Sequence, residues 1–331
     1  MIRNLPLALA ALALPLPAIA QDAPSPNQIV AEANAEEWVK IAPEDLLVMT
    51  LAPDRGGDAR EVVIQLMPEP FSQGWVANIR TLARAGWYDG ISVNRVQDNY
   101  VVQWGDPNYD NPEAGGEAKA VPANLAAVPE NEYSVRLDEP AIAKIRTYFE
   151  TTASRVAPSD PTTLYRADPY ARAHAFFDGW PIAMTDDEPV AWPVHCYGMV
   201  GVGRGYSPDT GSGAELYTVI GHAPRHLDRN IALVGRVVEG MEHLSSLPRG
   251  SGALGFYTAE EADKRTPIVS VRVASDLPDS ERPAFEYLST EGETFTRYAE
   301  ARANRRDPFF IHPAGGADIC NIPVPVRRVA D

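Results

Sequence analysis

The sequence predicts a mainly β fold with flanking helices. Residues 89–106 read as a turn, a strand, a tight turn and a second strand, which together make a hairpin. Residues 266–274 predict a further strand, because Val269, Val271 and Val273 alternate with other residues at the period of two that strands show. Segments whose apolar residues fall at helical spacing, such as 72–86 and 139–150, predict the flanking helices.

The hairpin brings two polar side chains together. Arg95 lies on the first strand and Gln103 on the second, so the fold-back places them on one surface. Strand periodicity predicts that Val93 and Arg95 share a face of the first strand, and Val101 and Gln103 a face of the second. A permanent cation beside an amide is a poor hydrolytic or redox site. Such a pair is suited to binding a polar, uncharged group such as a peptide carbonyl.

The hairpin also carries a family resemblance. Residues 88–107 read YDGISVNRVQDNYVVQWGDP, which is similar to the pattern YDG-x-x-FHRV-x-x-x-F-x-x-QGGDP of the cyclophilins, a family of peptidyl-prolyl cis-trans isomerases. The resemblance covers roughly residues 45–106 and 195–275. It implies a closed eight-stranded antiparallel barrel over residues 45–275, interrupted by an inserted segment at 107–193.

The flanking elements follow the same pattern. Residues 61–69 resemble a family strand, and 72–86 predict a helix with Ser72 as N-cap and Gly86 as C-terminal stop. Trp75, Ile79 and Leu82 of this helix fall at helical spacing. Further strands resembling those of the family are expected at 198–204, 211–219 and 227–240.

The inserted segment begins with a Pro/Gly/Asn/Glu-rich linker. It continues with a predicted helix at 139–150, whose apolar stripe is Ile142, Ile145 and Phe149. Aromatic clusters follow at 176–184 and 192–197. Such a segment acts either as a lid or client-binding surface, or as a packed subdomain covering one end of the barrel, and we favour the packed subdomain.

A C-terminal extension spans residues 276–331. Residues 291–306 predict a helix with Phe295 and Tyr298 on one side, and residues 321–328 predict an extended ending. The two cysteines of the chain, Cys196 and Cys320, either form a disulfide that ties this extension to the barrel or remain buried thiols.

The N-terminus has the pattern of a secretory signal peptide over residues 1–20. Arg3 supplies a positive charge, an apolar stretch follows, and Ala18 and Ala20 make a small-residue motif that predicts cleavage after Ala20. The apolar stretch is too short and too proline-rich to span a bilayer, so no membrane insertion is expected after its removal. We expect a periplasmic protein in which residues 21–44 form a linker or helix before the barrel.

Charge narrows the range of partners. The net charge of −16 over 331 residues disfavours nucleic acid and anionic membranes. Solubility explains the acidity better than a preference for cationic clients. The six histidines make no metal-binding pair, so we expect no metal and no cofactor, and we expect a monomer.

The resemblance also assigns roles to residues. Arg95 would be the catalytic arginine, and Gln103 would bind the substrate backbone beside it. The remaining substrate-binding positions, some lining the proline pocket and some contacting the adjacent backbone, are Tyr100, Val101, Gly203, Arg204, Glu215, Tyr217, His226 and Leu227.

The chain differs from the family at several of these positions. Glu215 replaces a glutamine, and we expect its negative charge close to Arg95. The other replacements are Asn94 and Ile231 for histidine, Tyr100 and Tyr217 for phenylalanine, Val101 for methionine, and His226 for the tryptophan of many members.

Two functions follow from the resemblance. The first is an isomerase that accelerates proline-limited folding of exported proteins. The alternative is a catalytically weak cyclophilin fold that binds proline peptides or acts as a scaffold in the envelope. Arg95 and Gln103 favour the isomerase.

Overall fold

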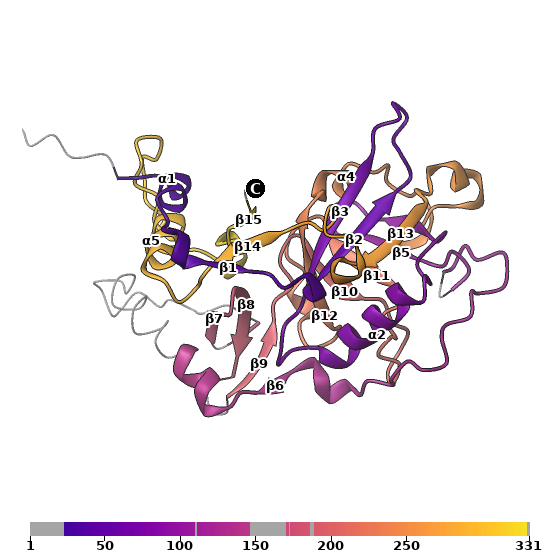
Figure 1. Ribbon diagram of the computed structural model, residues 1–331, viewed down its shortest axis with the longest axis horizontal. Helices are drawn as coiled ribbons and strands as arrows, with labels where there is room; N and C mark the ends of the chain where they lie inside the picture. Colours follow the sequence, from indigo (N-terminus) through magenta and orange to yellow (C-terminus); the bar gives the residue numbers. More distant parts are fainter. Residues whose placement is uncertain (1–22, 110, 146–169, 172, 186–188, 330–331) are drawn as a thin grey trace, which may run out of the picture.

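The computed structural model describes residues 23–329 apart from 110, 146–169, 172 and 186–188. Two lobes are apparent in Figure 1, a β barrel and a smaller lobe formed by the insertion and the two ends of the chain. The expected signal segment and its cleavage site at Ala20 lie outside the described residues.

The larger lobe is the expected eight-stranded antiparallel barrel, and it is nearly closed. Its strands follow the order β13-β2-β3-β12-β10-β11-β5-β4. The edge strands meet through a bridge between Ser92 and Pro267 and a hydrogen bond of 2.9 Å from the Val93 N–H to the Thr266 carbonyl. The strand bounds are Leu46–Leu51 (β2), Arg60–Leu66 (β3), Ser92–Val96 (β4), Val101–Gly105 (β5), Met199–Val202 (β10), Leu216–Val219 (β11), Leu233–Glu239 (β12) and Ile268–Val273 (β13).

A bulge changes the expected face of β13. Val269 is 53% exposed, whereas Val271 and Val273 are buried. The register against β2 shifts between Ile268 and Ser270, so Ile268 takes the inward position that strict alternation gives to Val269. The prediction that Val269 shares a face with Val271 and Val273 was therefore wrong.

Helix α2 (Gln73–Arg84) packs on the barrel as its apolar spacing indicates. Trp75, Ile79 and Leu82 are fully buried, and the helix contacts β13 and β12. Ser72 occupies the N-cap position but makes no capping hydrogen bond through its side chain, since its φ of 56° places it in the left-handed region. The prediction of a capping serine was wrong in this respect.

The insertion forms a four-stranded antiparallel sheet in the order β6-β9-β8-β7. The strands are Val135–Arg136 (β6), Ala173–Phe177 (β7), Trp180–Met184 (β8) and Val190–Pro193 (β9). Of the helix expected at 139–150, residues 139–145 are helical and Ile145 is buried, and the remainder lies outside the part of the chain that the structure describes.

The two ends of the chain fold together. Helix α1 (Pro26–Ala31) packs on α5 (Glu293–Ala303), and a three-stranded sheet has the order β1-β14-β15. Phe295 and Tyr298 are buried on one side of α5, as their spacing predicts. The strands are Trp38–Lys40 (β1), Phe285–Leu288 (β14) and Val326–Arg328 (β15).

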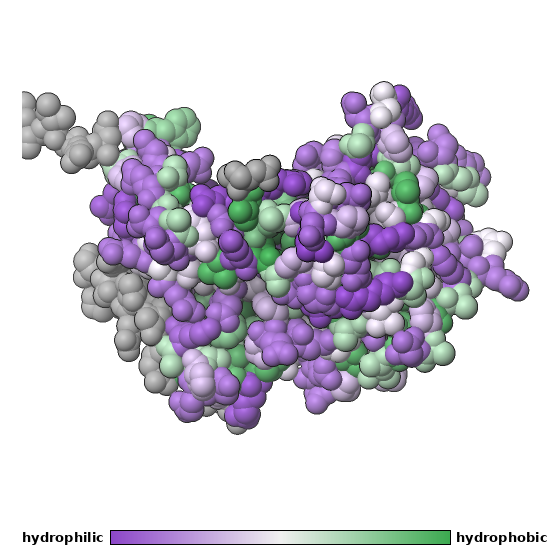
Figure 2. Space-filling view, viewed as in Figure 1, coloured by the Kyte–Doolittle hydropathy of each residue, from purple (hydrophilic) through white to green (hydrophobic). Residues whose placement is uncertain are grey.

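Short helical elements complete the chain. Helix α4 covers Met241–Ser245. Turns of 3-10 helix lie at Ala35–Glu37, Pro43–Asp45, Glu130–Tyr133, Arg225–Leu227, Ala253–Gly255, Ala259–Lys264, Ala274–Asp276 and Ile319–Asn321. Among the described residues, no helix has the length and apolar character needed to cross a membrane. On the face seen in Figure 2, hydrophilic residues cover most of both lobes.

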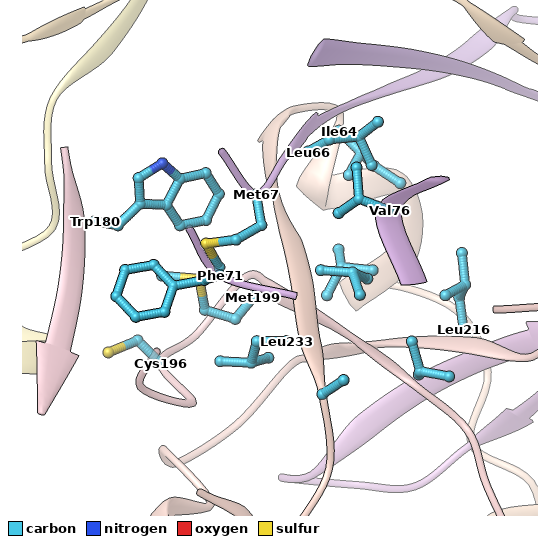
Figure 3. Close-up of a cluster of buried hydrophobic side chains, with 14 of the residues drawn as sticks. Ile64, Leu66, Met67, Phe71, Val76, Trp180, Cys196, Met199, Leu216 and Leu233 are labelled. Atoms are coloured by element: carbon cyan, nitrogen blue, oxygen red, sulfur yellow. The ribbon is translucent and has the colours of Figure 1, made fainter. Parts of the chain in front are cut away.

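The insertion is packed against one end of the barrel. Phe177 meets Phe71 edge to face with the ring centroids 6.1 Å apart, and Phe176 meets Phe295 of the extension at 5.0 Å. In Figure 3, Trp180 of the insertion lies beside Met67 and Phe71 of the barrel. The hydrophobic core therefore continues from the barrel into the smaller lobe.

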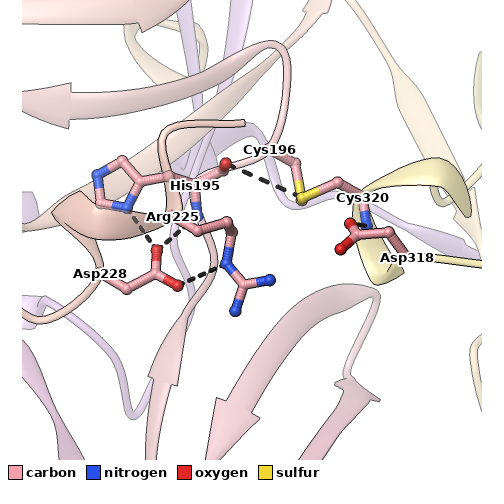
Figure 4. Close-up of a disulfide and its surroundings, with 6 residues drawn as sticks. All are labelled: His195, Cys196, Arg225, Asp228, Asp318 and Cys320. Atoms are coloured by element: carbon pink, nitrogen blue, oxygen red, sulfur yellow. Dashed lines mark hydrogen bonds and ion pairs between the residues drawn. A yellow bond between two sulfur atoms is a disulfide. The ribbon is translucent and has the colours of Figure 1, made fainter. Parts of the chain in front are cut away.

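A disulfide crosses the same junction. Cys196, which precedes β10, is bonded to Cys320 in the extension, with a Cα–Cα distance of 5.1 Å (Figure 4). The two residues are separated by 124 positions. Chain-entropy models assign a loop of this length a stabilisation of about 5 kcal/mol, because the cross-link removes conformations from the unfolded chain.

Replacing Cys196 and Cys320 together with serine is expected to lower the free energy of unfolding by about 2–5 kcal/mol. Urea unfolding followed by circular dichroism measures this change. The wild type in the presence of a reductant is the control, and it should approach the double variant. Equal unfolding midpoints for the oxidised wild type and the double variant would show that the bond adds no stability.

Candidate active site

The centre of the site is the β4–β5 hairpin. Arg95 lies opposite Gln103 in the register, and Val93 lies opposite Trp104. The register shifts between Val93 and Arg95, so Asn94 is an additional residue in β4. Val93 is fully buried in the barrel, whereas Arg95 is turned outward. The prediction that Val93 and Arg95 share a face was wrong, because the bulge reverses the alternation between them.

Asn94 fixes this bulge from within the barrel wall. Its side chain is buried and donates to the Gly105 carbonyl over 2.9 Å. It also accepts a hydrogen bond of 2.6 Å from the Ser92 hydroxyl. These bonds attach the bulge to β5. The backbone at Arg95 is therefore fixed, and this backbone determines the direction in which the Arg95 side chain projects.

The Arg95 guanidinium is held by neutral acceptors. Its Nε donates to the Leu254 carbonyl over 2.7 Å, one terminal nitrogen donates to the Gln103 side-chain oxygen over 3.0 Å, and the other donates to the Gln97 side-chain oxygen. Among the described residues, no carboxylate forms an ion pair with Arg95. Burial lowers the pKa of Arg95, because removal from water disfavours the cation.

Two aromatic rings flank the same guanidinium. The Arg95 carbon Cζ lies 5.7 Å from the centroid of the Tyr100 ring and 5.5 Å from that of Phe256. Both distances are within the range in which a cation is attracted to an aromatic face. The cation is therefore confined between rings and amides and remains able to interact with a ligand.

Arg95 and Gln103 border a cavity of about 830 Å³. Part of its wall is an apolar cluster, in which Val101, Tyr217 and Val219 are buried and pack against Tyr100 and Ile231. The cavity thus combines an apolar wall with a few polar groups, as ligand sites commonly do. Nine of the ten residues that the resemblance assigns to the site line it: Arg95, Tyr100, Val101, Gln103, Gly203, Arg204, Glu215, Tyr217 and Leu227.

The tenth residue, His226, lies elsewhere. It is exposed and stacks on Tyr100, with ring centroids 6.4 Å apart, and it is not part of the cavity wall. His226 therefore supports the outer side of Tyr100 rather than lining the pocket itself.

The Glu215 carboxylate is turned into the protein. Glu215 is 5% exposed, and its carboxyl lies within 2.1 Å of the position that a Cβ would occupy at Gly105, so a side chain at that position would displace the carboxyl. Burial, together with the charge of Glu215, raises the pKa of Tyr88. In the described part of the chain no ion pair joins Arg95 to Glu215, and the closeness of the two charges stays a prediction.

Gly203 and Arg204 form another side of the cavity. The Gly203 N–H donates to the Glu215 carbonyl over 2.8 Å, and a Cβ at Gly203 would lie 3.5 Å from the Gln103 amide nitrogen. Arg204 donates to the carbonyls of Asn230 and Gly205 over 2.8 and 2.7 Å. These bonds direct Arg204 along the rim of the cavity.

Sequence reasoning missed the loops that complete the cavity. Leu254 and Phe256 come from the segment before β13, and Tyr206 follows β10. Asn108, Asn111, Pro112 and Ala114 belong to the first residues of the insertion. No spacing rule places such irregular segments, although the fact that they directly follow Asp106 and Pro107 is a hint. Within the described ranges, no cluster of three or more histidine, cysteine or acidic residues could hold a metal ion.

Comparison with protein families matches residues 57–273 to the family described as cyclophilin type peptidyl-prolyl cis-trans isomerase/CLD. The chain belongs to this family. The match confirms the resemblance of the hairpin and assigns this cyclophilin peptidyl-prolyl cis-trans isomerase activity. Comparison with curated proteins found no match.

A cyclophilin of known structure shares the fold of this chain. The crystal structure of cyclophilin AquaCyp293 from Hirschia baltica is similar, with a TM-score of 0.59, 21% identity, and coverage of 90% of this chain and 98% of that chain. A cyclophilin type isomerase from Cryptosporidium parvum, crystallised in the presence of the dipeptide Ala-Pro, has a TM-score of 0.35, 11% identity, and coverage of 69% of this chain and 97% of that chain.

The isomerase rate is expected to be independent of pH between about pH 7 and about pH 9, because neither a guanidinium nor an amide changes charge in that range. Burial lowers the pKa of Arg95, but arginine remains protonated in proteins over this range. NMR exchange spectroscopy on an Ala-Pro peptide measures the rate at each pH, with the peptide alone as control. A titration within the range would point to a proton-transfer group.

Proposed function

We propose that this cyclophilin accelerates the isomerisation of X-Pro bonds by stabilising the twisted amide with Arg95. The uncatalysed reaction takes tens to hundreds of seconds. Its barrier of about 18–20 kcal/mol comes from amide resonance, which is lost when the bond twists. The catalyst therefore breaks no covalent bond, but it must bind the twisted amide more tightly than the planar one.

The chemistry of the twisted amide explains why an arginine can stabilise it. As the amide twists, the proline nitrogen becomes pyramidal and gains a lone pair, which accepts a hydrogen bond that the planar nitrogen does not accept. A guanidinium directed at this nitrogen interacts with the twisted form preferentially. Arginine keeps its charge and holds its donors in a fixed fork, so little reorganisation is needed during the reaction.

The observation that carries the proposal is the Arg95–Gln103 pair beside the apolar wall. Arg95 borders the cavity, and Gln103 lies opposite it in the hairpin. A proline ring against Tyr217 and Leu227 would bring its nitrogen toward the guanidinium, while Gln103 binds the peptide backbone. Burial of Arg95 strengthens the interaction, because water screens a half-buried cation less than an exposed one.

We further propose that the clients are exported polypeptides. The support is the signal-like sequence of residues 1–20, together with the disulfide between Cys196 and Cys320. Disulfides persist mainly in oxidising compartments such as the bacterial periplasm. A folding catalyst there meets newly exported chains whose X-Pro bonds have not yet reached their native isomers.

Replacing Arg95 with alanine is expected to lower kcat/KM for an Ala-Pro peptide by about 10²-fold, as loss of one transition-state donor commonly does. Arg95→Lys keeps the charge but loses the fork, so we expect an intermediate rate. A protease-coupled assay, supported by NMR exchange, measures both variants.

The matched control for this prediction is Arg84→Ala. Arg84 is a surface arginine of α2, where it pairs with Glu44 and Asp276, and it does not line the cavity. Arg84→Ala should therefore retain the rate of the wild type. If Arg95→Ala also isomerises the peptide at the wild-type rate, the arginine mechanism is wrong.

The proposed export is tested by producing the full chain in a Gram-negative bacterium and separating the periplasm from the cytoplasm. We expect a periplasmic product that begins at Gln21, because cleavage is predicted after Ala20. Intact mass spectrometry measures the processed N-terminus. An Ala18→Arg and Ala20→Arg double variant is the control and should remain unprocessed. Unprocessed wild-type chain confined to the cytoplasm would contradict the proposal.

A further inference from the structure

A chain of buried polar contacts lies directly behind the apolar wall of the cavity. The Tyr217 hydroxyl is 2.9 Å from His195 Nε2, and His195 Nδ1 is 2.8 Å from Asp228 Oδ1. Arg225 Nε donates to Asp228 Oδ2 over 2.6 Å. All four side chains are buried, with His195 fully so, and Figure 4 shows the side chains of His195 and Arg225 both directed at the Asp228 carboxylate. The mechanism proposed above uses none of these groups except the Tyr217 ring.

The hydrogen-bond pattern fixes the direction of each proton in this chain. Asp228 Oδ1 also accepts the backbone N–H of His195 over 3.0 Å, and an ionised carboxylate can only accept. His195 Nδ1 therefore carries the proton donated to Asp228, which leaves Nε2 as an acceptor in the neutral ring. The Tyr217 hydroxyl accordingly donates to His195.

The charges around His195 are compatible with the neutral ring. Burial lowers the pKa of His195, and the charges of Arg225 and His226 act in the same direction. Asp228 acts in the opposite direction. A neutral imidazole therefore persists through the neutral pH range, and the acceptor for Tyr217 remains in place.

The geometry around Tyr217 explains why this acceptor matters. The ring belongs to the apolar wall with Val101 and Ile231, while its hydroxyl lies over Gly201, where a Cβ would be only 2.3 Å away. A buried phenolic hydroxyl without a partner is unfavourable. If the acceptor were lost, the ring would gain by turning its hydroxyl toward the solvent-accessible cavity, and it would then occupy the space for the proline ring.

We propose that His195, oriented by Asp228 and Arg225, is a positioning residue that keeps the Tyr217 ring against the wall and the proline pocket open. The proposal rests on the function proposed above, in which Tyr217 borders the proline ring. His195 touches no substrate, and its effect reaches the pocket only through the Tyr217 hydroxyl.

Two substitutions of His195 separate this role from a structural one. His195→Gln places an amide oxygen near the position of Nε2 and keeps an acceptor for Tyr217. His195→Asn places an amide nitrogen near the position of Nδ1, so it keeps the donor to Asp228 but does not reach Tyr217. We expect His195→Asn to raise the Kd and KM for an Ala-Pro peptide by about fivefold to tenfold with kcat little changed, as loss of one buried hydrogen bond implies. We expect His195→Gln to stay within about twofold of the wild type.

The same His195 substitutions in a Tyr217→Phe background complete the test. Phenylalanine has no hydroxyl to position, so His195→Asn should cause no further loss of peptide affinity there. NMR titration with the peptide gives each Kd, and thermal unfolding shows which variants fold. Equal losses in both backgrounds, or a greater loss with glutamine than with asparagine, would overturn the proposal and leave His195 a purely structural residue.

The two proposals fail in different ways. If the wild type does not isomerise the peptide, or if Arg95→Ala equals the wild type, the proposed function fails. If Arg95→Ala is impaired while His195→Asn binds the peptide as the wild type does, only the role of His195 is rejected. If neither His195 variant folds, Gly201→Ala tests the same contact, because its Cβ displaces the Tyr217 hydroxyl, and wild-type affinity in that variant rejects the proposal.

Discussion

The site depends on one constraint, a half-buried cation whose hydrogen-bond partners are neutral. Arg95 is held by two side-chain amides and the Leu254 carbonyl, and no carboxylate of the described residues neutralises it. A carboxylate partner would satisfy the guanidinium before any substrate arrived. Amides hold it in place and leave most of its electrostatic potential directed at the cavity. The position of the Arg95 guanidinium is maintained by its burial, by the rings of Tyr100 and Phe256, and by the bulge at Asn94.

The four-stranded sheet of the insertion and the chain ends pack on the barrel through a junction that lies outside the cavity lining. Arg236 on β12 lies at the junction and is buried, with hydrogen bonds of 2.8 Å to Gln65 of the barrel and to the Gly179 carbonyl of the insertion. Its guanidinium also lies over the ring of Trp180, and burial lowers its pKa to about 10. One side chain thus joins the barrel to the insertion, and the disulfide ties the extension to the same region.

The barrel was predicted from the resemblance of ordered motifs to the cyclophilin family, and each motif can be read from a short stretch of chain. The pairing of Arg95 with Gln103 followed from the length of the hairpin, and the burial of Trp75 in α2 followed from helical spacing. The bulges at Asn94 and near Val269 could not be predicted from the sequence, because an extra residue in a strand leaves the composition of the segment unchanged. The strands of the insertion were also missed, since short runs that are buried throughout lack alternation. The contacts of His195 with Asp228 and Tyr217 could not be predicted either, because they join residues distant in sequence.

The walls of the cavity are built from two kinds of structure. One side consists of strands β5 and β11, which hydrogen bonding and the barrel core hold rigidly. The opposite side comes from irregular segments, namely the start of the insertion around Asn111 and the loop that carries Leu254 and Phe256. The loop side also contributes to the arginine site, because the Leu254 carbonyl accepts the hydrogen bond of Arg95 Nε. Exchange of the segment around Asn111 alone would alter the cavity wall and keep the Leu254 carbonyl that holds Arg95.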